Sequence, residues 1–155
     1  MKFISNYIIF FRELSKTNKS SFSILCNRRT WAYILLYLSS ESAPLNKYIR
    51  LGFLFLLRII FSIESHIRLN LGGAVFFPHP RNIVIGAHFI GENCVLYHNI
   101  TLGAKRMDYA YNKNNRPKLE RECVICTGAV VVGGGTLTSK TIVAANSLLV
   151  LRNDE

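Results

Sequence analysis

The sequence has few acidic residues and no long uninterrupted apolar run. Its 155 residues include 19 Lys and Arg but only 9 Asp and Glu, which gives a formal net charge of +10. The most apolar run, residues 51–63, is interrupted by Arg58 and is shorter than the roughly 20 apolar residues that cross a bilayer. We therefore expect no membrane-spanning helix. The basic excess favours anionic partners such as phosphates, acidic lipids or nucleic acid, or it serves solubility alone.

Cysteine is also scarce, which argues against a disulfide-stabilised scaffold. The four cysteines are Cys26, Cys94, Cys123 and Cys126. Cys123 and Cys126 have the spacing of half a zinc site or a redox pair, but no second pair accompanies them. We interpret Cys94 and Cys123 as packing residues.

A secretion signal is not apparent either. The apolar stretch in residues 1–12 is followed by Glu13 and not by a small-residue cleavage site. We expect a cytoplasmic protein, with possible peripheral contact at the inner face of the membrane.

Residues 1–62 are predicted to form a short α-helical N-terminal region. They hold nine basic and two acidic residues, and their apolar positions are interrupted by polar ones. Pro44 is expected at a helix start. Residues 47–63 then mix Leu, Ile and Phe with basic residues. This segment is either an amphipathic helix packed on its own domain or an interfacial membrane helix.

Residues 63–155 follow a different pattern, in which an aliphatic residue returns every six positions. The first run is Ile90, Leu96 and Leu102, and the second is Leu119, Ile125, Val131, Leu137, Val143 and Leu149. Short repeats of this period predict a β-helix, in which three hexads form one triangular coil and the aliphatic residue of each points inward. Turn positions favour Gly or Asn, and Gly133–Gly135 and Asn146 are candidates.

Two irregularities interrupt the repeat. Ile85 and Ile90 look like successive hexad starts but lie five positions apart. Leu102 and Leu119 lie 17 apart, so we predict an inserted loop at residues 104–118. Long loops in compact repeat folds are usually functional or disordered.

The hexads and their flanking motifs resemble the hexapeptide-repeat acyltransferases, most closely the serine acetyltransferases and their polysaccharide O-acetyltransferase relatives. The resemblance covers roughly residues 63–151. Its main stretches are IESH at 63–66, FPHPRNIVIG at 77–86, NITLG at 99–103 and TGAVVVG at 127–133. It implies a mainly β protein with a left-handed parallel β-helix of about five coils. It also implies an acetyl-CoA-dependent O-acetyltransferase that forms a homotrimer with active sites between subunits.

The resemblance identifies His79 as the general base and Glu64 as the carboxylate that orients it. Glu64 stands where the family has Asp, so the carboxylate is kept on a longer stem. The assignment is chemically reasonable, because an acceptor hydroxyl is a poor nucleophile until a base with a near-neutral pKa removes its proton. A carboxylate beside that base fixes its tautomer and stabilises the imidazolium.

The acceptor site departs from the serine-specific pattern. Pro78 replaces the Asp that precedes the catalytic His in those enzymes, and Asn115-Arg116 replaces their Arg-His pair. We therefore expect a sugar hydroxyl of a surface polysaccharide as acceptor, with serine O-acetylation for cysteine biosynthesis as the alternative. The candidate acceptor contacts are His66, Arg81 and Arg116.

The resemblance also implies a groove for acetyl-CoA between coil stacks. The candidate contacts for this co-substrate are Gly103, Gly128 and Ala145, with Lys140 near the phosphates.

Three other functions are less favoured by the sequence. His66, His79, His88 and His98 allow a zinc site of the carbonic-anhydrase type, but they lack a tight ligand cluster, and we expect no metal. The basic, Tyr-bearing loop could bind nucleic acid, although acceptor gating or CoA contact suits it better, and we expect no nucleic acid. A non-catalytic trimeric scaffold would bind no CoA.

Overall fold

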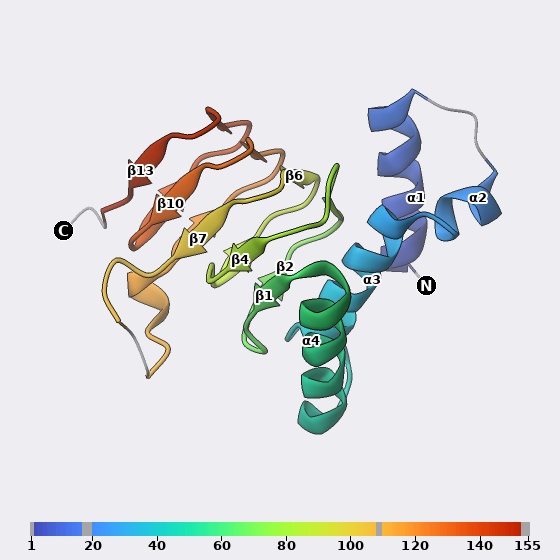
Figure 1. The fold of residues 1–155 in the computed structure, drawn as a ribbon, viewed down its shortest axis with the longest axis horizontal. Coiled ribbons are helices and arrows are strands. Elements are labelled where there is room, and N and C mark those ends of the chain that lie inside the picture. Colours follow the sequence, from blue (N-terminus) through green and yellow to red (C-terminus); the bar gives the residue numbers. More distant parts are fainter. Residues whose placement is uncertain (1, 17–19, 108–109, 153–155) are drawn as a thin grey trace.

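The computed structural model describes residues 2–16, 20–107 and 110–152, and its helices gather at one end of a β-solenoid (Figure 1). Four helices precede the strands: α1 (Lys2–Ser15), α2 (Ser21–Leu25), α3 (Arg28–Ser39) and α4 (Lys47–Phe61). None of the helices in these ranges is long and apolar enough to cross a membrane. The helical prediction for the N-terminal region is thereby confirmed.

Asn side chains set the starts of α3 and α4. Asn27 accepts a hydrogen bond from the Arg29 backbone N–H at 3.0 Å, and Asn46 accepts one from the Tyr48 N–H at 2.9 Å. Both bonds satisfy amides that lack a partner within the first helical turn. Pro44 therefore does not start α4, contrary to the sequence-based expectation.

The strands form three parallel sheets that wind into a solenoid, as expected for a left-handed β-helix. The first sheet has five strands: β1 (Ile63–Ser65), β4 (Ile83–Ile85), β7 (Thr101–Gly103), β10 (Val130–Val132) and β13 (Leu148–Val150). The second has four: β2 (Asn70–Leu71), β5 (Phe89–Ile90), β8 (Pro117–Leu119) and β11 (Gly135–Leu137). The third also has four: β3 (Val75–Phe76), β6 (Cys94–Leu96), β9 (Val124–Ile125) and β12 (Ile142–Val143).

The inward positions of the strands stack from coil to coil, which confirms the hexad repeat. Ile85 pairs with Leu102, and Leu102 pairs with Val131; all three side chains are buried. Burial of one such side chain contributes roughly 1.5–3 kcal/mol. Ile85 and Ile90 both occupy inward positions despite their five-residue spacing.

The corners of the solenoid use left-handed backbone. At the corner between the third and first sheets, this conformation recurs in consecutive coils at Ser62, Asn82, Asn99, Gly128 and Asn146. Asn and Gly tolerate it at low steric cost. Of the expected turn residues, Gly133–Gly135 and Asn146, three have positive φ: Gly133, Gly135 and Asn146. We call this corner, which also carries the turn containing His79, the His79 corner.

The inserted segment leaves the solenoid after β7 and rejoins it at β8. It contains a 3-10 turn, Lys113–Asn115, whose N-cap is Asn112. Pro117 and Lys118, predicted as loop residues, belong to β8 and pair with β11.

The helices cover the N-terminal end of the solenoid through a shared core. Phe10 and Phe11 of α1 contact Phe76 of β3 edge to face, with ring centroids 6.3 and 5.5 Å apart. Because α3 also belongs to this core through Tyr33 and Leu36, its first turn lies beside the first coil.

Candidate active site

His79 lies in the turn between β3 and β4, and its imidazole is exposed at the His79 corner. The ring of His98, from the next coil, lies nearly perpendicular to it, with centroids 5.4 Å apart. His98 Nδ1 lies 3.4 Å from Thr127 Oγ1 of the following coil. Extending the strand registers therefore stacks His79, His98, Thr127 and Ala145 along one corner of the solenoid.

A cavity of about 800 Å³ opens at this corner, between the start of α3 and the His79 turn. Its volume falls in the range of small-molecule sites. The described lining residues are Asn27, Arg28, Arg29, Pro78, His79, Pro80, Arg81 and His98. The predicted residues His79 and Arg81 thus share one cavity. Arg28 and Arg29 were not predicted as site residues, and His98 was considered only as a zinc ligand.

Glu64 lies on β1 and forms an ion pair with Arg58 of α4, at 3.2 Å between Oε1 and Nη2. Its side chain is 53% exposed. Among the described residues, no hydrogen bond or ion pair joins Glu64 to His79. The role of Glu64 in orienting His79 therefore stays a prediction.

The loop residue Tyr111 brings together two other candidates, His66 and Arg116. The His66 ring stacks on Tyr111 with centroids 4.2 Å apart, and the Arg116 guanidinium lies 4.3 Å from the Tyr111 centroid. Arg116 Nη1 also donates to the Gly86 carbonyl at 3.0 Å, and the Tyr111 hydroxyl donates to the Arg68 carbonyl at 3.0 Å. His66 and Tyr111 line a separate cavity of about 220 Å³.

Tyr111 was missed as a site residue. Its only sequence signal was an aromatic side chain in a basic loop, which does not reveal its contacts with His66 and Arg116. The described lining of the larger cavity includes neither His66 nor Arg116.

The four candidate CoA contacts lie at different corners. Gly128 and Ala145 belong to the His79 corner, and a Cβ on Gly128 would collide with the Asn146 side chain. Gly103 ends β7, where its carbonyl accepts a hydrogen bond from the Gly133 N–H at 3.0 Å. Lys140 lies at the corner between the second and third sheets, 3.8 Å from Glu122 Oε2.

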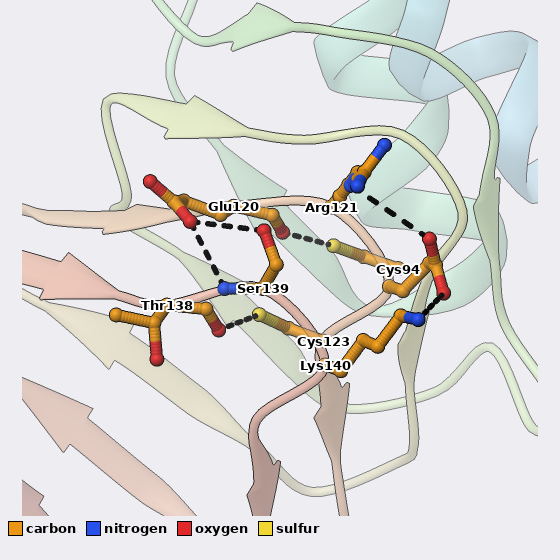
Figure 2. Close-up of polar contacts among 8 residues, drawn as sticks. Cys94, Glu120, Arg121, Cys123, Thr138, Ser139 and Lys140 are labelled. Atoms are coloured by element: carbon orange, nitrogen blue, oxygen red, sulfur yellow. Dashed lines mark hydrogen bonds and ion pairs between the residues drawn. The ribbon is translucent and has the colours of Figure 1, made fainter.

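The cysteines at that latter corner act in packing, as predicted. Cys94 and Cys123 are buried, and their thiols donate to the carbonyls of Glu120 and Thr138 at 3.1 and 3.2 Å (Figure 2). Two causes raise the pKa of Cys94 above its ordinary value: the larger is the hydrogen bond with the Cys123 thiol, and the second is burial. Cys94 is therefore a poor nucleophile. In the described part of the chain, no three His, Cys, Asp or Glu side chains gather as metal ligands.

Comparisons with known proteins identify similar chains. No family model matches the sequence. A putative serine acetyltransferase of Schizosaccharomyces pombe is 30% identical over 92 residues, which cover 59% of this chain and 33% of that protein. The serine acetyltransferase of Helicobacter pylori (strain ATCC 700392 / 26695) is 30% identical over 95 residues, which cover 61% and 54%. The chain thus spans about a third to a half of the curated relatives it matches.

Solved structures agree in fold. A serine acetyltransferase in complex with CoA superposes with a TM-score of 0.74 at 19% identity, covering 95% of this chain and 60% of that one. The serine acetyltransferase of Neisseria gonorrhoeae gives 0.78 at 17% identity, covering 96% and 58%. The chain shares the fold of serine acetyltransferases.

Proposed function

We propose that the chain is an acetyl-CoA-dependent O-acetyltransferase with His79 as its general base. The observation that carries this proposal is the exposed imidazole of His79 inside a substrate-sized cavity, in the fold of serine acetyltransferases. The names of the curated relatives support acetyl transfer, and a complex with CoA among the solved structures supports acetyl-CoA as the co-substrate.

The reaction is direct transfer between two bound substrates. His79 takes the proton of the acceptor hydroxyl, and the resulting alkoxide attacks the thioester carbonyl. The carbon–sulfur bond breaks, CoA leaves as its thiolate, and the imidazolium returns the proton to that sulfur. This scheme needs no covalent enzyme intermediate. His98, edge-on to His79, restricts the positions that the base can adopt.

The acceptor has two candidates. L-serine is favoured by the names of the curated relatives and by a solved complex with serine, which has a TM-score of 0.73 at 17% identity. A sugar of a surface polysaccharide is the second candidate. The cavity favours it, because about 800 Å³ far exceeds what an amino acid fills and three arginines line it.

The functional assembly is proposed to be a homotrimer. Apolar side chains lie exposed on the outer face of the first sheet, including Val84 and Leu148, at 41% and 68% exposure. Contact with neighbouring copies would cover such a face and leave the CoA groove between subunits. Light scattering on the purified chain should give about 53 kDa, three times 17.6 kDa. A monomer at micromolar concentration would contradict this assembly.

Thiol release from acetyl-CoA tests the activity and sorts the acceptors. The purified chain is incubated with L-serine or with nucleotide- and lipid-linked sugars. Release with serine assigns the first acceptor, and release only with a sugar assigns the second. A chain that binds no acetyl-CoA would contradict the proposed activity.

A further inference from the structure

Three arginines are among the described residues that line the His79 cavity. Arg28 and Arg29 come from the first turn of α3, and Arg81 comes from the His79 turn. Neither Asp nor Glu appears among the described lining residues. Within the described ranges, no ion pair engages any of the three guanidinium groups.

The local structure keeps these arginines near the cavity. The guanidinium groups of Arg28 and Arg29 each lie 5.9 Å from an aromatic centroid, those of Phe61 and Phe76 respectively. Such contacts hold a cation over a ring and leave its N–H groups available. Arg81 belongs to the His79 turn, which is two residues longer than the matching turn at His98. The longer turn keeps both His79 and Arg81 at the cavity.

We propose that Arg28, Arg29 and Arg81 bind a phosphate or diphosphate group of the acceptor. The inference rests on the acetyl transfer proposed at His79 and specifies its acceptor as a phosphorylated sugar. Guanidinium groups pair with phosphate through two parallel hydrogen bonds, and the positive charges of three of them offset the negative charge of a diphosphate group. With its charged end held by the arginines, the sugar hydroxyl would reach the His79 imidazole in the same cavity.

CoA also carries phosphates, but its candidate contacts at this corner lie on the other side of His79. Gly128 and Ala145, the candidate CoA contacts at this corner, lie in later coils, beyond His98. The arginines lie on the side of the helices. The two substrates would then meet at His79 from opposite ends of the corner, as direct transfer requires.

Pyrophosphate binding, measured by calorimetry on the full chain, tests the arginines without requiring turnover. The Arg28→Gln/Arg29→Gln variant should bind inorganic pyrophosphate at least about tenfold more weakly than wild type, because charge-assisted hydrogen bonds are lost. Arg121→Gln is the matched control, since Arg121 is exposed at another corner beside Glu122, and it should bind like wild type. Arg81→Gln gives a second variant outside the helices, in case the double variant does not fold.

Three results would overturn the proposal. The first is pyrophosphate binding that none of the cavity variants weakens. The second is a loss of pyrophosphate affinity in Arg121→Gln as large as that in the cavity variants. The third is a loss of acetyl-CoA affinity in the cavity variants as large as their loss of pyrophosphate affinity, which would assign the arginines to the donor. The proposed activity fails separately. If wild type releases no thiol with any acceptor yet shows arginine-dependent pyrophosphate binding, the anion site stands and the transferase does not.

Discussion

The imidazole rings of His79 and His98 stand at 86° to one another, with centroids 5.4 Å apart, although the residues belong to successive coils. The pairing follows from the solenoid, because parallel strands in consecutive coils bring corresponding turns together. His98 in turn lies beside Thr127 of the third coil. The corner therefore packs the His98 ring against the proposed base, and both imidazoles line the cavity.

Glu64 and Arg58 give a prediction about the orientation of the base. If Glu64 orients His79 in the functional assembly, Glu64→Gln should lower kcat by about tenfold or more, with little change in KM. The matched control is Arg58→Gln, which removes the other half of the exposed ion pair and should leave kcat close to wild type. Equal, small effects from both variants would reduce Glu64 to a surface partner of Arg58.

Gly128 gives a prediction about stability. Its φ of +72° is strained for any residue with a Cβ, and the Asn146 side chain would also have to shift, so Gly128→Ala should destabilise the chain by about 1–3 kcal/mol. Denaturant unfolding checks this value. Ala145→Gly at the same corner is the control, because Ala145 is exposed and should show a smaller loss. Wild-type stability in Gly128→Ala would mean that the corner relaxes readily.

Helix α4 gives a prediction about membranes. Tyr48, Phe55 and Ile59 are 78%, 64% and 66% exposed, and Lys47 and Arg58 lie on the same helix. We expect the chain to float with anionic liposomes and to detach at high salt. Phe55→Ser/Ile59→Ser should abolish flotation, whereas Ile142→Ser, which removes an exposed apolar residue of the solenoid, should not. Absence of flotation by wild type would assign this face to protein contacts.

The solenoid can be predicted from the sequence because its repeat involves only residues that are close together in the chain. Each inward residue, such as Leu119, Ile125 or Val131, is separated from the next by one short strand and one turn. Pro44 shows the limit even of local signals, since the Asn46 side chain caps α4 further along.

Only some of the residues that line the cavity could be predicted from the sequence. His79 and Arg81 belong to the repeat and its motif, whereas Arg28 and Arg29 reach the site only because the helices pack across the end of the solenoid. That packing depends on contacts such as Phe11 against Phe76, which are 65 positions apart and leave no spacing pattern. Tyr111 is a similar case, because its partners His66 and Arg116 lie in different coils.

Thiol release by His79→Asn, compared with His98→Asn and wild type, tests the central claim most directly. Loss of the base should reduce turnover by about 10²–10⁴-fold. His98→Asn, which removes only the neighbouring ring, should lose far less, and both variants should bind acetyl-CoA like wild type. Turnover by His79→Asn equal to that of wild type would contradict the account, because no proton would then pass through this imidazole.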